Sequence, residues 1–272
     1  MSRLWQSILS VWAWMVLVVC ILVWFPLMLV LRILTAPFDK GRYLTGYLFR
    51  RIGPVMAALN PLWRFRYSGK LPPDPRRPFV VVSNHESFAD ILLISHLPWE
   101  MKWLSKAELF RIPVMGWMMW LAGDIPVKRG FGPSAVEAME RCREVLRRRV
   151  SVMIFPEGTR SKTAELLPFK DGAFRLAIEA GVPILPLAVS GTSTALPKHG
   201  WRFGRSAAVV RVLPPVETEG MTLDDVPALK ARVREMIVGT RDALAAAAGD
   251  GVSAPGHRER VPGQPRPPGP AA

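Results

Sequence analysis

Residues 79–90 read FVVVSNHESFAD, and this segment decides the fold. Four apolar residues in a row at 79–82 predict a short strand that is buried on both faces, as in a sheet covered by helices on each side. The polar residues after them predict a turn, and residues 87–97 then show the apolar spacing of a helix. A buried strand followed directly by a helix is the repeating unit of an α/β domain.

The same alternation continues along the chain. Further strands are predicted at residues 101–105, 124–129, 151–155, 183–190 and 207–213. Helices are predicted at residues 134–149, 222–248 and 169–180, the last ending at Gly181. Glycine suits that end because it readily adopts the left-handed conformation that closes many helices. We therefore expect an α/β fold with a mixed, largely parallel sheet flanked by helices.

The N-terminal part is apolar throughout. Residues 4–31 contain no charged side chain, and Arg3 and Arg32 bracket them. Such a helix is long enough to cross a hydrocarbon core of about 30 Å. We expect a retained membrane anchor, which spans the bilayer or lies in one leaflet, rather than a cleaved signal peptide. Pro26 leaves a kinked or hairpin form open.

Three other segments have a distinctive composition. Residues 43–63 are amphipathic, with breaks expected at Pro54 and Pro61, and lie at the membrane interface or pack on the globular domain. Residues 112–121 are apolar on nearly every face, which suits either the core or a membrane contact. The tail at 249–272 is rich in Pro and Gly and has no apolar face, so we expect it to be disordered.

The composition indicates an anionic partner. The chain has 36 Lys and Arg against 22 Asp and Glu, a net charge of +14, and ten Trp among its 272 residues. Because Trp is enriched at membrane interfaces and no nucleic-acid-reading motif is present, we expect membrane lipids rather than nucleic acid. The two cysteines and four histidines show no metal-ligand spacing, so we expect neither a metal site nor a disulfide framework.

His85 and Asp90 are the first candidate site residues. In one continuous helix, side chains at this spacing would point about 140° away from each other. If Ser87 caps the helix, Asp90 is the third helical residue, and His85 lies in the turn before it and can fold back onto the carboxylate. A histidine held by a carboxylate is a general base with a fixed tautomer. The alternative is a polar loop with an ordinary helix cap.

Residues 155–161, which read FPEGTRS, follow another apolar strand. Gly158 permits a tight turn and a close approach of the backbone to a ligand. The planar guanidinium of Arg160 suits a phosphate, with the hydroxyl of Thr159 beside it. Glu157 can orient Arg160 or bind a substrate hydroxyl. The alternative is a β-turn with a surface ion pair, which contributes about 0–1 kcal/mol and needs no ligand.

Together these segments resemble the glycerolipid acyltransferase family, in particular its 1-acylglycerol-3-phosphate acyltransferases. Three further segments of the sequence are similar to sequence blocks of this family. Residues 123–129 (GDIPVKR) look like the family's Gly-x-Ile-x-x-x-Arg block, and residues 169–174 (FKDGAF) are similar to its Phe-Lys-x-Gly-Ala-Phe element. Residues 182–189 (VPILPLAV) look like its Val-Pro-Ile-x-Pro-Val block, with leucine at 187 where valine is frequent. The resemblance covers about residues 67–215.

The resemblance implies a role for each site residue. His85 would be the general base, and Asp90 would orient it. Arg160 would bind the phosphate of the acceptor. The full set of substrate-binding residues that the resemblance implies is Glu157, Gly158, Thr159, Arg160, Arg129 and Lys170.

The resemblance also implies a reaction. A fatty acyl group would pass from acyl-CoA or acyl carrier protein to the sn-2 hydroxyl of 1-acyl-sn-glycerol 3-phosphate (lysophosphatidic acid), giving phosphatidic acid in phospholipid biosynthesis with no cofactor beyond the thioester. The alternatives are acylation of glycerol 3-phosphate or another lysophospholipid, and an inactive, membrane-tethered lipid-binding protein. A hydrolase is disfavoured because the chain has no Gly-x-Ser-x-Gly elbow.

The expected organisation has three parts. Residues 1–66 would form membrane-anchoring helices, residues 67–248 the catalytic domain, and residues 249–272 the disordered tail. We expect the basic catalytic domain to face the cytoplasm, where the membrane surface is anionic.

Overall fold

The computed structural model describes residues 2–160, 165–196 and 200–250, so most of the tail expected at 249–272 and Ser161 lie outside the described residues. A seven-stranded sheet has the order β1-β7-β6-β2-β5-β3-β4. The strands are β1 Trp63–Gly69, β2 Val80–Ser83, β3 Met101–Lys106, β4 Ile125–Val127, β5 Ser151–Ile154, β6 Ile184–Ser190 and β7 Ser206–Val212. All neighbours pair in parallel except β6 and β7, which confirms the expected mixed, largely parallel sheet.

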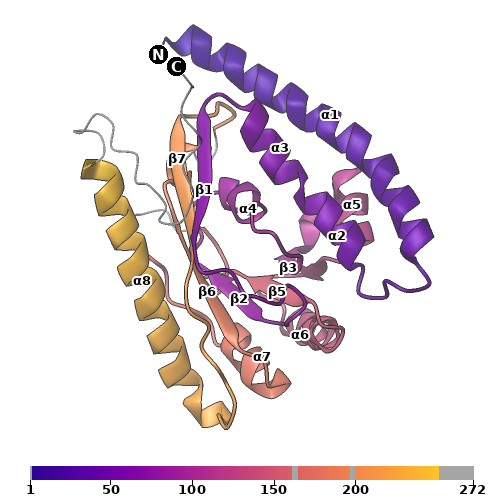
Figure 1. Ribbon diagram of the computed structural model, residues 1–272, viewed down its shortest axis with the longest axis vertical. Helices are drawn as coiled ribbons and strands as arrows, with labels where there is room; N and C mark the ends of the chain where they lie inside the picture. The colour runs from indigo at the N-terminus through magenta and orange to yellow at the C-terminus, as the bar shows by residue number, and fades with distance from the viewer. Residues whose placement is uncertain (1, 161–164, 197–199, 251–272) are drawn as a thin grey trace, which may run out of the picture.

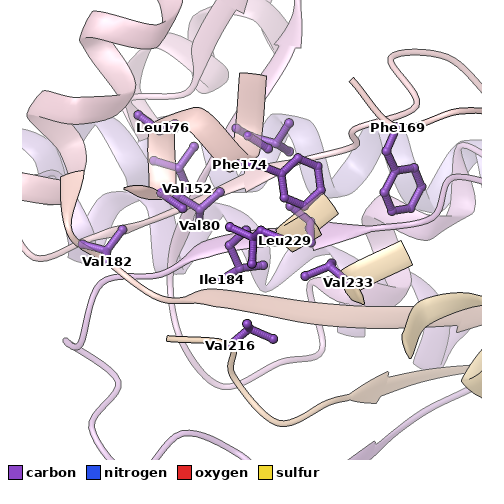
Figure 2. Packing of buried hydrophobic residues seen from close by; sticks show 14 of the residues in the cluster. Val80, Val152, Phe169, Phe174, Leu176, Val182, Ile184, Val216, Leu229 and Val233 are labelled. Carbon is purple, nitrogen blue, oxygen red and sulfur yellow. The ribbon is translucent and has the colours of Figure 1, made fainter. Parts of the chain in front are cut away.

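β2 shows why helices cover both faces of the sheet. Val80 and Val82 belong to one buried cluster and Val81 to another, because successive side chains of a strand point to opposite sides. The first cluster includes side chains of α6 (Gly132–Arg147), α7 (Gly172–Ala180) and α8 (Val226–Asp250), and Figure 2 shows members of β2, β5, β6, α7 and α8 packed together. The second cluster packs against α4 (Ala89–Ile94) on the opposite face.

The helix after β2 is shorter than the sequence predicts. α4 covers six residues, Ala89–Ile94, whereas the apolar spacing predicts a helix over residues 87–97. At its C-terminal end the hydroxyl of Ser95 donates back to the carbonyl of Ile91 at 2.7 Å, and the next backbone bonds have the tighter spacing of turns. The helical geometry is therefore lost before the last apolar residues of the pattern.

The sequence pattern does not predict β1, which reads WRFRYSG. Most of its side chains are exposed or partly exposed and two are arginines, so no continuous apolar run marks it. It pairs in parallel with β7 at the edge of the sheet. β1 begins at Trp63 and crosses the boundary expected at residues 66 and 67. The division into anchor, catalytic domain and tail stays a prediction.

α1 (Arg3–Thr35) is a single helix that continues through Pro26 and forms no hairpin. In the part of the chain that the structure describes, it is the one helix long and apolar enough to cross a membrane. Figure 1 shows it lying across the domain, over α3, α2 and α5. The indole N–H of Trp24 donates to the carbonyl of Leu48 at 2.9 Å, and the side-chain amide of Gln6 donates to that of Phe203 at 3.1 Å. Its outer surface exposes large apolar side chains.

The second N-terminal stretch packs on the domain. It forms α2 (Tyr43–Arg50) and α3 (Ile52–Leu59), and the break between them is at Arg51 rather than at Pro54. Pro54 lies in the first turn of α3, where the missing backbone N–H costs no helical bond. α2 lies against β3, and α3 lies against α4, so this stretch joins α1 to the sheet.

Residues 112–121, whose pattern suits the core and the membrane equally well, are partly buried and partly exposed. They contain most of α5 (Met115–Ala122). Met118 is fully buried in a cluster with side chains of α1 and α3. Trp117 and Trp120 of the same helix are 53% and 44% exposed.

Candidate active site

The two segments singled out by the sequence meet at the carboxyl ends of two central strands of the sheet. β2 and β5 are parallel neighbours, so the turns that follow their carboxyl ends lie side by side. The imidazole ring of His85 stacks on the ring of Phe155, with centroids 3.9 Å apart and 15° between the planes. The backbone N–H of His85 also donates to Oε1 of Glu157 at 2.8 Å. The turn that leads to Arg160 is therefore attached directly to the histidine.

His85 and Asp90 make the contact that the sequence predicts. Nδ1 of His85 lies 2.7 Å from Oδ2 of Asp90, whose side chain is fully buried. Because a carboxylate only accepts, the ring proton is assigned to Nδ1, and Nε2 keeps a free lone pair. The cap differs from the prediction. α4 begins at Ala89, so Asp90 is its second residue, and Phe88 occupies the position that we assigned to Ser87.

Backbone and hydroxyl donors hold the Asp90 carboxylate in place. Oδ2 accepts from the backbone N–H groups of Glu86 and Ser87 at 2.8 and 3.0 Å, and Oδ1 accepts from the hydroxyl of Thr192. The carboxylate thus has one orientation, which presents Oδ2 to the imidazole. That arrangement fixes both the tautomer and the direction of the free Nε2.

Glu157 contacts the backbone in a way that the sequence did not predict. Oε1 accepts from the N–H of His85, Oε2 accepts from the N–H of Leu167 at 3.0 Å, and the residue is 4% exposed. Burial raises the pKa of this carboxyl, and the two N–H donors oppose that effect. The expectation was a contact with Arg160 or with a substrate hydroxyl. In the structure Glu157 ties the turn after β5 to the turn after β2.

The expected cations gather near these strand ends. Gly158 has a φ of +71°, and a Cβ atom there would lie 3.0 Å from Nζ of Lys170, so the lysine side chain lies across the glycine. Partial burial lowers the pKa of the Arg129 guanidinium, the carboxylate of Glu108 opposes this, and the nearby Arg160 lowers the pKa further. Thr159 is exposed in the same turn as Arg160. The structure therefore groups Arg160 with Arg129, and Lys170 with Gly158.

This donor set suits an anion. Lysine and arginine side chains beside a glycine turn are typical phosphate ligands. Within the described ranges, no group of three or more His, Cys, Asp or Glu side chains is placed to hold a metal ion.

The comparisons with known proteins agree with this geometry. Residues 64–190, which contain both turns, match the acyltransferase family model. The chain carries an acyltransferase-family domain. The crystal structure of the 1-acyl-sn-glycerophosphate (LPA) acyltransferase PlsC from Thermotoga maritima has a similar fold, with a TM-score of 0.75 and 25% identity, over 90% of this chain and 99% of that one. The family resemblance read from the sequence is confirmed.

Curated relatives of the acyltransferase domain have a consistent name. The 1-acyl-sn-glycerol-3-phosphate acyltransferase alpha of Homo sapiens is 44% identical over 166 residues, which are 60% of this chain and 59% of that protein. A 1-acyl-sn-glycerol-3-phosphate acyltransferase of Chlamydomonas reinhardtii is 36% identical over 197 residues, 70% of this chain and 59% of that protein. The chain thus spans 59% of the length of these relatives.

Three residues around the His85–Asp90 pair (the dyad) were not singled out from the sequence. Thr192 follows β6, 102 positions after Asp90, and no local pattern marks it. Phe155 stands in the FPEGTRS motif, but only the structure shows it under the imidazole. Glu86 has a pKa raised to about 7 by burial and by Asp90, and its Oε2 lies 3.3 Å from the hydroxyl oxygen of Thr192.

An apolar cavity adjoins the dyad of the acyltransferase domain. Its volume is about 380 Å³, and side chains of α1, α3, α4, α5 and β3 line it. Phe88 and Ala89, which stand between His85 and Asp90 in the chain, form part of its wall. The cavity therefore touches the segment that carries the His85–Asp90 pair and extends under the N-terminal helices.

Proposed function

We propose that this chain transfers a fatty acyl group from an acyl thioester to the sn-2 hydroxyl of 1-acyl-sn-glycerol 3-phosphate, giving phosphatidic acid. The observation that carries the proposal is the pair of His85 with the buried Asp90, fixed against the turn that leads to Arg160. A base for the hydroxyl and cations for the phosphate are what acylation of a glycerophosphate needs. The names of the relatives support the same acceptor.

In the proposed reaction His85 acts on the acceptor. Nε2 takes the hydroxyl proton while the hydroxyl oxygen attacks the carbonyl carbon of the thioester. The new ester C–O bond forms, the C–S bond breaks, and the leaving thiolate takes the proton from the imidazolium. Asp90 holds the ring through Nδ1 and offsets its transient positive charge. The balance needs neither an acyl-enzyme nor a cofactor, and much of the acceleration comes from positioning.

Arg160 is the proposed ligand of the acceptor phosphate. Its guanidinium can donate two parallel hydrogen bonds to phosphate oxygens, which a lysine cannot. Arg129 and Lys170 add positive charge, and Thr159 adds a hydroxyl at the exposed side of the turn. Gly158 leaves the room in which the side chain of Lys170 lies.

The apolar cavity is the proposed site for an acyl chain. Its wall at Phe88 and Ala89 is next to the catalytic pair, and α1 closes it from outside. Because α1 is fastened along the domain and exposes apolar residues such as Val19 and Leu22 outward, we propose that it lies in the membrane surface rather than carrying the domain away from it. Lipid acceptors would then reach the site directly from the membrane. We place the basic domain on the cytoplasmic side, where the surface is anionic.

A donor-by-acceptor activity matrix on the purified full chain tests the proposal. Acyl-CoA and acyl carrier protein thioesters are each combined with lysophosphatidic acid, glycerol 3-phosphate and lysophosphatidylcholine. We expect turnover with lysophosphatidic acid and at least one donor. Turnover with lysophosphatidylcholine but none with lysophosphatidic acid would reject this acceptor, and no turnover with any pair would favour an inactive lipid-binding protein.

A further inference from the structure

A second cavity lies away from the catalytic turns. Its volume is about 240 Å³, and it opens between the loop after α1, the start of β4 and the C-terminal end of α6. The catalytic turns follow the carboxyl ends of β2 and β5, whereas this cavity lies near the amino ends of β3 and β4. It shares no lining residue with the His85 and Arg160 turns.

The lining of this cavity is mainly cationic. Its charged residues are Lys40, Arg42, Lys102, Arg141, Arg148, Asp124 and Glu144. Both carboxylates are engaged: Asp124 pairs with Arg50, and Glu144 pairs with Arg148. Carboxylates outside the lining, Glu100 and Glu137, pair with Lys102 and Arg141. Among residues 2–160, 165–196 and 200–250, neither Lys40 nor Arg42 forms an ion pair with a carboxylate, so the cavity keeps an excess of positive charge.

Arg42 is held in this cavity at a conformational cost. Its φ is +52°, in the left-handed region that side chains other than glycine rarely occupy. The guanidinium donates to the carbonyl of Trp120, and the side-chain stem passes over Gly123, where a Cβ atom would lie 3.2 Å from Cδ of Arg42. Burial lowers the pKa of Arg42, and repulsion from Arg32 and Arg148 lowers it further.

One further cation beside Arg42 has unused hydrogen-bonding capacity. Nη1 of Arg32, in the last turn of α1, is buried and has no hydrogen-bond partner in the part of the chain that the structure describes. A buried guanidinium N–H without an acceptor is costly and is normally satisfied by a ligand or water. Arg32 does not line the cavity, but its charge is close enough to Arg42 to add to the positive charge there.

The surroundings of the cavity are apolar and exposed. Leu34 and Phe38, at the end of α1 and in the loop after it, are 66% and 71% exposed, and Trp120 of the cavity lining is 44% exposed. Tryptophan, bare apolar residues and arginine at a helix end are the usual composition at the level of lipid headgroups. An anion with attached acyl chains therefore fits this position better than a free anion.

We propose that the cavity between the α1–α2 loop, β4 and α6 binds the phosphate of an anionic membrane phospholipid, at a site separate from the acceptor site. Lys40 and Arg42 supply the donors, and Arg32, which is not part of the lining, adds positive charge close to Arg42. The acyl chains of the lipid lie against the exposed residues of α1. The site holds the end of α1 and the α1–α2 loop at the membrane surface without taking part in catalysis.

Binding of a short-chain lipid to the full chain in neutral detergent tests this site. The Arg160→Ala variant is used throughout, so that the acceptor site contributes little to phosphate binding. Dioctanoyl phosphatidylglycerol is titrated, with native mass spectrometry to count bound lipid and the Tm as a second readout. Dioctanoyl phosphatidylcholine and inorganic phosphate are the comparison ligands. We expect phosphatidylglycerol alone to bind one equivalent and to raise the Tm.

Matched variants locate the binding. Adding Arg42→Gln should weaken phosphatidylglycerol binding by about tenfold or more, as expected for the loss of a charge-assisted hydrogen bond. Lys40→Gln removes an exposed side chain that forms no ion pair with any described residue, and it should weaken binding without unfolding the chain. The control is Arg147→Gln, which also removes one positive charge. Arg147 is at the C-terminal end of α6, outside the cavity lining, and its side chain is 67% exposed.

Three results would overturn the proposal. Equal losses in Arg42→Gln, Lys40→Gln and Arg147→Gln would indicate general charge attraction rather than a site. Equal stabilisation by inorganic phosphate would indicate a soluble ligand, and equal binding of phosphatidylcholine would remove the preference for an anionic lipid. Acyl transfer is not the readout, so failure of the proposed enzymatic function would leave these outcomes unchanged.

Discussion

Two groups of cations near opposite ends of the strands differ in what accompanies them. Past the carboxyl ends of β2 and β5, Arg160 belongs to a turn that is bonded to His85, and His85 is bonded to the buried Asp90. Near the amino ends of β3 and β4, Arg42 and Lys40 line a cavity that contains no imidazole. Both places are suited to a phosphate, but only the first also offers a base.

The difference shows what chemistry requires beyond charge. Cations alone bind and position an anion, whereas acyl transfer also needs a proton acceptor with a fixed tautomer beside the bound substrate. At the carboxyl ends, Glu157, Thr192 and Phe155 all hold the dyad. The cavity near the amino ends has no comparable support for a reactive group.

The largest expected effect comes from removing the base, which should lower activity at one site and leave lipid binding at the second cavity unchanged. His85→Ala should lower kcat for lysophosphatidic acid acylation about 10²–10⁴-fold, because general-base catalysis is lost. Phosphatidylglycerol binding at the second cavity should not change. His96→Ala, at a partly buried histidine outside the dyad, serves as the control. Unchanged turnover in His85→Ala would remove the proposed role of this residue.

The next effect tests whether the cations at the catalytic end bind the acceptor. Arg160→Lys keeps the charge but loses the planar fork, so the acceptor KM should rise by the equivalent of about 1–3 kcal/mol. Steady-state kinetics with acceptor and donor varied separately measures it, with Arg147→Lys as the control. A change confined to the KM of the thioester donor would show that the residue is misassigned.

A smaller effect sharpens the role of the support around the dyad. Thr192→Val keeps the shape of the side chain but removes the hydroxyl that donates to Oδ1 of Asp90. We expect kcat to fall about tenfold with both KM values unchanged, and the free energy of unfolding to fall by about 1–3 kcal/mol. Thr194→Val, in the same short turn, loses only an exposed bond to the Gly191 carbonyl and is the matched control. Equal kinetic effects in the two variants would contradict a positioning role.

The smallest effect concerns pH. Burial, with the charge of Asp90 in second place, raises the pKa of Glu86 from 4.5 to about 7, while Thr192 and Arg241 oppose the shift. The folded chain therefore keeps a proton that the unfolded chain releases, so the stability contributed by this protonation is lost as pH rises from about 4.5 through about 7. Glu86→Gln does not titrate. Its Tm relative to the unmodified chain should rise between about pH 5 and about pH 8, and a constant difference would contradict the assignment.

Local patterns predicted most of the sheet and half of the site. The apolar runs at β2, β5 and β6 are visible because both faces of these strands are buried, and β1 is missed because an edge strand with exposed arginines has no such run. The contact of His85 with Asp90 is local and was predicted. The contacts of Glu157 with the His85 backbone and of Thr192 with Asp90 join distant segments, and no local pattern encodes them.

The sequence by itself determined an α/β domain with an apolar N-terminal helix, a His–Asp pair after one strand and an arginine turn after another. These follow from periodicity, turn residues and spacing, which are properties of neighbours along the chain. Only the tertiary structure decided that β2 and β5 are adjacent and parallel, which brings the two turns together. It also decided that α1 lies along the domain and that Arg42 faces a cavity, because strand order and helix packing depend on burial across the whole chain.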